Sequence, residues 1–394
     1  MRLFSYILAS RAVYALLWFY LSPLLPAMSR DLHVSEAQLG FLPAAFIAGA
    51  AAAQIPASLA GSRIGDVRTA GLGLLLLGLG SALTAASPTW GAALALRAVA
   101  GVGAGLFFST AGAALVALRP REAGRALGLY NASFNIGAFL GYYWGYVAEP
   151  LGWRIAAAAP GVAAAAMAPP LIMQGGFKHG ARPSPSAIWL GLASFPLWGA
   201  VYAANSLAAA WLHYYRGLQA SEAGAITSAS MLSGLLGGFL GSIYDKAKDK
   251  RAVFLYSAVL SAAPMAALPY LPTAAAPLLV FTYGVAYTIY ITAIYAEGSR
   301  SGAPASALAV INVVDMALGL NASYLFSFTM ALSPPSAWEV DAGLALASAL
   351  ATFALAGRIS SNKEMGPPGF EPGISRAARP TASRGTRPIL NAHL

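Results

Sequence analysis

Residues 90–117, WGAALALRAVAGVGAGLFFSTAGAALVA, decide the fold class of this chain. They form one apolar run whose single charged residue is Arg97, and the run exceeds the roughly 20 residues that a helix needs to cross a bilayer. The whole chain of 394 residues is 58% hydrophobic and only 10% charged, whereas soluble domains carry about 25% charged residues. The mean hydropathy is +0.63. The sequence therefore predicts an all-α integral membrane protein, and the long unbroken apolar runs exclude a β-barrel.

Eleven other apolar stretches resemble this one, which gives twelve predicted transmembrane helices. They lie near residues 3–28, 37–60, 69–88, 90–117, 124–148, 153–174, 187–213, 222–243, 252–271, 275–297, 304–331 and 338–358. From about residue 359 to 394 the chain becomes rich in Pro, Gly, Ser and Arg without periodicity, and we expect this tail to be disordered.

The basic residues predict how the chain lies in the membrane. Of the 24 Lys and Arg residues, 19 fall at the N-terminus, in the loops after even-numbered spans and in the tail, and only Arg30, Arg154 and Arg216 fall in the opposite loops. Because cytoplasmic loops carry an excess of Lys and Arg, both termini are predicted to be cytoplasmic in a multi-pass protein of the cell membrane. The net charge of +10 is thus expected to set orientation among membrane lipids, and no nucleic-acid partner is predicted.

An internal repeat divides the chain into two halves. Residues 32–37, LHVSEA, recur as LQASEA at 218–223, and residues 126–131, ALGLYN, recur as ALAVIN at 307–312. The offsets, 186 and 181 residues, are nearly constant. Two pseudo-symmetric six-helix bundles are predicted, at 1–174 and 188–358, joined by a central cytoplasmic loop at 175–187.

Four local patterns on this frame resemble motifs of the major facilitator superfamily, and the resemblance covers residues 1–358. In chain order they are SLAGSRIGDVR at 58–68, RAVAGVGAG at 97–105, GWR at 152–154 and GSIYDKAKDKR at 241–251. The first copy of the loop motif has Ser62 where the family has an aspartate, and Asp66 lies one helical turn later. The resemblance implies that these loops gate the protein by holding the halves together while the site faces outward. The implied gating residues are Arg63, Asp66, Asp245, Lys246 and Arg251.

Asp315 is the only acidic residue that the sequence places near the middle of a predicted span. At about 1.5 Å per residue from Ala303 it lies ~18 Å deep, about half-way across the hydrocarbon. A charged carboxylate at that depth costs about 2.5–3.5 kcal/mol. Asp315 is therefore predicted to face a wet cavity, to pair with another group or to be protonated.

Two arginines also lie within spans. Arg11 is close enough to the cytoplasmic end of its span that we expect its side chain to reach the lipid headgroups, with a substrate contact as the alternative. Arg97 lies deeper, in the glycine-rich segment quoted above. It either bonds backbone carbonyls of a neighbouring helix or serves as an anion contact or coupling charge.

The resemblance also implies which other residues line the central cavity. These polar and aromatic side chains, on spans that line the cavity in this family, could bind solute by hydrogen bonds and stacking: Tyr14, Trp18, Gln54, Asn131, Asn135, Asn205 and Tyr287.

The resemblance implies a secondary active transporter that moves a small polar or anionic solute by alternating access. The expected driver is the proton, and the expected working unit is a monomer. The sequence has no cysteine, no HExxH and no GxxxxGK[ST] loop, so no enzyme activity, cofactor or metal is predicted. Two alternatives are a transport-inactive sensor or assembly partner and a multidrug/proton antiporter. Tyr142 disfavours the antiporter, because that motif has a proline after its second glycine, here Gly141.

Overall fold

The computed structural model describes residues 2–174, 187–236, 240, 243–244, 246–299 and 304–361. The helices of the first half are α1 (Arg2–Phe19), α2 (Leu25–Asp31), α3 (Phe41–Ile64), α4 (Asp66–Ala85), α5 (Trp90–Leu118), α6 (Ala123–Tyr142), α7 (Trp144–Leu151) and α8 (Trp153–Ile172). Those of the second half are α9 (Ala187–Arg216), α10 (Ala220–Thr227), α11 (Ala229–Leu235), α13 (Lys250–Ala267), α14 (Ala276–Ser299), α15 (Pro304–Leu332) and α16 (Pro334–Ser361). No strand occurs in these ranges.

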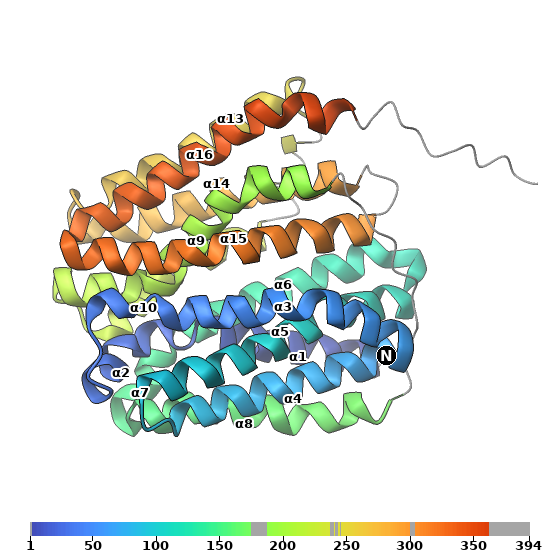
Figure 1. Ribbon diagram of the computed structural model, residues 1–394, viewed down its shortest axis with the longest axis horizontal. Coiled ribbons are helices and arrows are strands. Elements are labelled where there is room, and N and C mark those ends of the chain that lie inside the picture. Colours follow the sequence, from blue (N-terminus) through green and yellow to red (C-terminus); the bar gives the residue numbers. More distant parts are fainter. Residues whose placement is uncertain are drawn as a thin grey trace, which may run out of the picture.

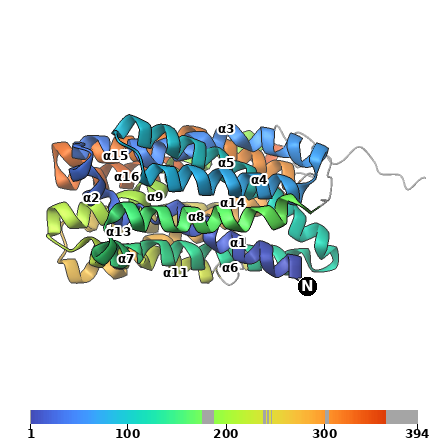
Figure 2. The same cartoon turned by 90° about the horizontal axis from the view of Figure 1, so that it is seen from below.

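The helices run side by side along the long axis of the molecule (Figure 1). Residue 2 and residue 361 lie at the same end of the bundle, which we call the terminal end, and the other end is the opposite end (Figures 1 and 2). Among the described residues, eight helical stretches are long and apolar enough to cross a membrane. The remaining predicted spans coincide with α6 and α7, α10 and α11, α13, and α16. Nearly all of the predicted tail and of the central loop lies outside the described residues, and α16 extends over the first residues of the tail, to Ser361.

Three of the predicted spans are interrupted in the structure. The first is divided into α1 and α2 by a short 3₁₀ helix, Ser22–Leu24, at Pro23. Proline lacks the backbone N–H that would continue an α-helix, so a break is expected there. The fifth span is divided into α6 and α7 near Tyr143, and the eighth into α10 and α11 near Ser228. Other short 3₁₀ helices are Glu36–Gln38, Pro120–Glu122 and Thr273–Ala275.

The helices form two bundles that meet along two seams. Helices α1, α3, α4, α5, α6 and α8 pack mainly against one another, and so do α9, α13, α14, α15 and α16. The bundles meet mainly where α3 contacts α15 and where α6 contacts α11. This arrangement confirms the predicted fold class and creates an interface between two similar units.

Glycine allows the backbones within the first bundle to touch. A Cβ added to Gly101 of α5 would lie 1.9 Å from the carbonyl oxygen of Phe46 in α3. A Cβ added to Gly103 would lie 2.2 Å from the backbone nitrogen of Leu77 in α4. The RAVAGVGAG segment therefore holds α5 directly between α3 and α4, as expected for small residues at membrane helix interfaces.

Gly101→Ala should destabilise the protein strongly. The added methyl group would force α5 away from α3, and overpacking of this kind costs about 1–3 kcal/mol. The measurement is the thermal unfolding midpoint of the detergent-purified protein. Gly91→Ala is the control, because the space around Gly91 in the same helix is open to 4 Å. Equal midpoints for the two variants would show that the α3–α5 contact is looser than described here.

Candidate functional site

The two bundles are closed against each other at the opposite end. The Ser29 hydroxyl lies 2.6 Å from the Tyr214 hydroxyl, and the Ser327 hydroxyl donates to the Ala37 carbonyl at 2.9 Å. Other hydrogen bonds across this end join Tyr215 to Glu36, Ser221 to Glu149 and Tyr142 to the Asn205 carbonyl. These bonds are polar and lie near the helix ends.

Contact between the bundles continues to the middle of the molecule. There the Gln54 amide lies 3.8 Å from the Met316 sulfur, and the Asn135 side chain of α6 packs directly on Gly234 of α11. Nearer the terminal end, no hydrogen bond or ion pair joins the bundles among the described residues.

Four of the predicted gating residues, Arg63, Asp66, Lys246 and Arg251, lie at the terminal end. Arg63, Lys246 and Arg251 are exposed, and none forms a hydrogen bond or ion pair through its side chain with another described residue. Asp66 is buried in the first turn of α4, where the positive end of the helix dipole favours a carboxylate. Asp245 lies outside the described residues.

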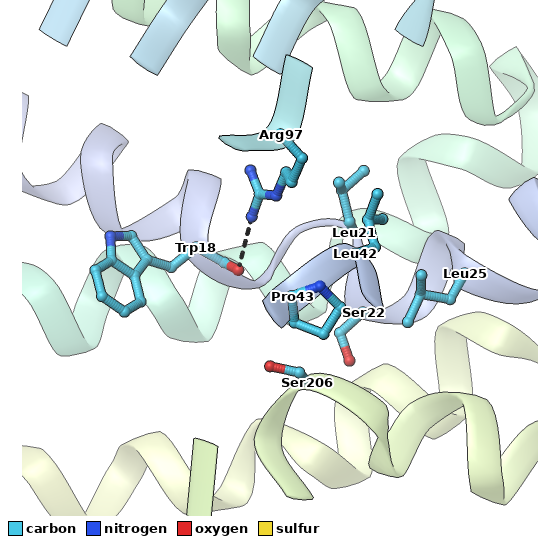
Figure 3. Close-up of a pocket in the computed structure, with 8 residues that line it drawn as sticks. All are labelled: Trp18, Leu21, Ser22, Leu25, Leu42, Pro43, Arg97 and Ser206. Carbon is cyan, nitrogen blue, oxygen red and sulfur yellow. Dashed lines mark hydrogen bonds between the residues drawn. The ribbon is translucent and has the colours of Figure 1, made fainter. Parts of the chain in front are cut away.

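A small cavity lies between the bundles towards the opposite end (Figure 3). Its volume of about 20 Å³ is enough for roughly one water molecule. It is lined by Trp18, Leu21, Ser22, Leu25, Leu42, Pro43, Arg97 and Ser206, of which the last belongs to the second bundle. The cavity is thus a narrow gap in the closed interface.

Arg97 lines this cavity but its hydrogen bonds go to the backbone. Its Nη2 donates to the carbonyls of Leu17 at 3.0 Å and Trp18 at 3.3 Å, and its guanidinium lies 4.0 Å from the centre of the Phe46 ring. These carbonyls belong to the last turn of α1, whose orphan acceptors a cation satisfies well. Of the two predicted roles, this geometry matches the structural one: Arg97 caps α1 where the first span is interrupted.

Aromatic rings fill the centre of the first bundle and reach the second. Tyr14 is fully buried and stacks on Phe107 with ring centres 5.0 Å apart. Trp18, one turn later on α1, meets Phe134 edge-on at 5.9 Å and Tyr202 of α9 at 6.1 Å. Two of the predicted site residues therefore belong to one aromatic cluster at the interface.

Arg11 does not extend to the membrane surface, and the expectation that it would is wrong. Only 2% of its surface is exposed, because its guanidinium lies within a cage of four aromatic rings. The distances from the guanidinium carbon to the ring centres are 4.2 Å for Tyr130, 4.5 Å for Tyr14, 4.7 Å for Phe134 and 5.0 Å for Phe108. The rings come from three helices, α1, α5 and α6. Contacts between helices cannot be read from the apolar pattern of a single span.

Asp315 is fully buried in the second bundle, between α9 and α15. One carboxyl oxygen accepts a hydrogen bond of 2.6 Å from the Ser194 hydroxyl, and the other has no hydrogen-bond partner among the described residues. No described basic residue forms an ion pair with it. Asp315 was predicted to face a wet cavity, to pair with another group or to be protonated. The structure provides a single neutral hydrogen-bond donor and no counter-ion among the described residues. Such surroundings suit a neutral carboxylic acid much better than a carboxylate.

Side chains of other helices bond the backbone of α9 near Asp315. Pro196 interrupts the hydrogen bonds of α9, and two freed backbone groups find partners in other helices. The Tyr290 hydroxyl donates to the Ala193 carbonyl at 3.1 Å, and the Leu197 N–H donates to the Ser348 hydroxyl at 2.8 Å. Ser194 thus holds Asp315 from a segment that α14 and α16 fix in place.

The other predicted site residues lie in three places. Asn205 joins the bundles, because its carbonyl accepts from Ser22 at 3.3 Å while its side chain accepts from Tyr283 at 3.0 Å. Asn131 is exposed on α6, and its carbonyl accepts from the Asn135 amide at 2.9 Å. Tyr287 is half-buried on α14 within electrostatic range of Asp315.

Asp341 is a buried acid that the sequence reading missed. Both of its carboxyl oxygens are buried without a hydrogen-bond partner among the described residues. The predicted span begins at residue 338, which puts Asp341 near its end. In the structure α16 begins at Pro334, so Asp341 lies two turns inside the helix. Trp338 and Ala345 lie on the same face of α16 as Asp341, one turn before and one turn after it. These apolar neighbours are the sequence signal that Asp341 is buried.

The repeat relates the seam that holds Arg11 to the seam that holds Asp315. The offset of 181 residues relates Phe134, which packs on Arg11, to Asp315. The seam between α1 and α6 in the first bundle likewise corresponds to the seam between α9 and α15 in the second. Arg11 and Asp315 therefore lie at corresponding seams but on different members of them, because α1 corresponds to α9 and α6 to α15.

Comparisons with known proteins agree with this architecture. A search of curated proteins found no match. Two crystal structures are similar in fold: a D-xylose–proton symporter (15% identity, 88% of this chain and 96% of that chain, TM-score 0.72) and a bacterial homologue of the human lysosomal transporter Spinster in an inward-facing, occupied conformation (14%, 92% and 96%, 0.68). The E. coli xylose transporter XylE in a partially occluded inward-open conformation is also similar (13%, 89% and 98%, 0.69). The family profile of the Major Facilitator Superfamily matches residues 7–322. With that match over most of its length, on a fold of two six-helix bundles, this chain belongs to the major facilitator superfamily.

Proposed function

We propose that the protein is a proton-coupled secondary transporter that moves a small polar or anionic solute by alternating access. Its family is one of membrane transporters, and its two bundles contact each other from the opposite end to the middle, with no hydrogen bond between them nearer the terminal end among the described residues. In alternating access, such bundles rock around a site near the middle of the membrane. The two alternatives, a transport-inactive sensor and a multidrug antiporter, lack a supporting observation of this kind.

Asp315 is the observation that carries the proposal of proton coupling. Its single hydrogen bond comes from a neutral hydroxyl, so the charged form would be left largely uncompensated in the bundle. A charged carboxylate at this depth costs about 2.5–3.5 kcal/mol. Opening of the interface would admit water and lower that cost, so the carboxyl would bind a proton in one conformation and release it in the other. One of the proteins with a similar fold is a proton symporter, so this fold is compatible with proton coupling.

The conformation described here would face the cytoplasm. The terminal end carries most of the basic residues, and the positive-inside rule places such an end on the cytoplasmic side of the cell membrane. Hydrogen bonds join the bundles at the opposite end, and among the described residues none joins them at the terminal end. Arg63 of the first bundle and Lys246 of the second are both exposed there. In this proposal they would lie on opposite sides of an open cytoplasmic gate.

Thiol labelling should confirm this orientation, because the chain contains no cysteine. Ala86→Cys and Ala274→Cys, at exposed positions of the opposite end, should react with an impermeant maleimide added to intact cells. Arg121→Cys and Lys248→Cys, exposed at the terminal end, should react only after the cells are opened. The reverse pattern would contradict the orientation.

Asp315→Asn should abolish proton-driven accumulation in proteoliposomes while counterflow exchange persists. Asparagine keeps the size and much of the hydrogen bonding of the aspartic acid but cannot take up or release a proton. The transported solute is first chosen by a stabilisation screen of metabolites on the purified protein, since a bound ligand raises stability by mass action. Accumulation is then followed under an imposed pH gradient.

Asp341→Asn is the matched variant, because it neutralises the other buried acid of the same bundle. It should still accumulate solute under the pH gradient. Loss of accumulation in Asp341→Asn together with normal accumulation in Asp315→Asn would assign coupling to Asp341 and contradict the proposal for Asp315.

A further inference from the structure

Arg11 carries a buried positive charge for which the structure provides no anion. Its Nε and Nη1 atoms are sealed from solvent and have no hydrogen-bond partner among the described residues. Its Nη2 also makes no hydrogen bond but is not among the sealed atoms. No acidic residue of the described chain forms an ion pair with Arg11. A guanidinium that is desolvated and left without acceptors is an expensive arrangement unless another group completes it.

The aromatic cage compensates this charge only in part. Ring faces attract the guanidinium through their quadrupoles, but they do not replace acceptors for its N–H groups. The Tyr130 hydroxyl is already engaged with the Phe108 carbonyl at 2.7 Å. The Tyr14 hydroxyl lies near Arg11 and the Trp18 indole N–H, but it makes no hydrogen bond of standard geometry with a described residue. The cage therefore leaves several donors unused and presents no carboxylate.

The unused donors lie on one face of α1. Arg11, Tyr14 and Trp18 follow one another at intervals of three and four residues, so their side chains share that face. Trp18 adds an indole N–H without a partner. The same face reaches the interface between the bundles, since Trp18 contacts Tyr202 of α9. A ligand bound along it would contact both bundles.

We infer that Arg11 binds the carboxylate of an organic monoanion whose apolar or aromatic body packs among the surrounding rings. A planar guanidinium binds a carboxylate through two parallel hydrogen bonds. One positive charge with no acid beside it balances one negative charge, whereas a dianion would leave a buried charge unpaired. Phe108 and Phe134 are the half-buried members of the cage, and their rings would have to shift to admit the ligand. This inference rests on the proposed transport function and specifies its substrate class.

The position of Arg11 fits a role in solute binding. Arg11 lies nine residues into α1 and Asp315 eleven residues into α15, so both are about 14–17 Å from the terminal end. The repeat relates the seams that hold them. The anion would bind to the first bundle and the proton to the second, both at about the same depth. The two bundles would then move around these two sites.

The test measures binding of benzoate and of benzamide, its uncharged analogue, to the purified full-length protein by isothermal titration calorimetry. Benzoate should bind and benzamide should not, a comparison that needs no variant. Arg11→Gln should weaken benzoate binding by roughly tenfold or more, since a charged hydrogen bond contributes about 1.5–3 kcal/mol. Arg11→Lys, which keeps the charge but not the planar fork, should give an intermediate affinity. Arg119→Gln is the control, because Arg119 also lies over a ring, that of Phe4, but at the surface.

Three results would overturn the inference: equal binding of benzamide and benzoate by the wild-type protein, undiminished benzoate binding by a folded Arg11→Gln variant, or preferential binding of inorganic phosphate. The outcome is separable from that of the proposed function. Arg11-dependent benzoate binding by a protein that transports nothing would uphold the anion site and contradict transport. Proton-driven accumulation of a neutral solute, without benzoate binding, would uphold transport and contradict the anion site.

Discussion

Direct backbone contact at glycine is the constraint on which the rest of the structure depends. Gly101 and Gly103 hold α5 so close to α3 and α4 that no side chain fits between them, and Gly137 similarly brings α6 against the Ala12 carbonyl of α1. Packed interfaces of this kind do not deform gradually, so the first bundle is expected to move as one body. Contact between the bundles is less extensive: α3 meets α15 and α6 meets α11, with hydrogen bonds near the opposite end and a close backbone approach of Gly40 to the Ser323 carbonyl. A rigid interior and a separable interface are what alternating access requires.

The same close packing isolates charge. Arg11 and Asp315 lie at corresponding seams of the two bundles, and each is surrounded by groups that do not neutralise it. Their environments differ chemically: aromatic rings and N–H donors surround the arginine, whereas a serine hydroxyl and tyrosines of α14 lie near the acid. These surroundings support the two proposals, an organic-anion site in the first bundle and a proton site in the second. Coupling would follow from movement of the bundles that changes both environments together.

Much of this fold can be predicted from the sequence, because apolar length and the distribution of charge act along the chain. The spans, the repeat and the packing role of the RAVAGVGAG segment can all be read directly from patterns in the sequence. The environments of single buried charges are not local. Arg11 was expected at the membrane surface because its depth in one span allows that position, but rings from α5 and α6 enclose it. Asp341 was overlooked because its depth depends on a helix start set by the turn at Ser333 and Pro334.

The most direct test of the account is a reversible cross-link across the closed end. Ala37 and Ser327, which belong to different bundles and are joined by the hydrogen bond described above, would both be replaced by cysteine in a protein that has no other cysteine. A short bifunctional thiol reagent with a reducible linker would then join them. If the bundles rock, uptake of solute into proteoliposomes should stop on cross-linking and return on reduction, and each single-cysteine variant should be unaffected. Undiminished uptake by the fully cross-linked protein would contradict alternating access by these two bundles.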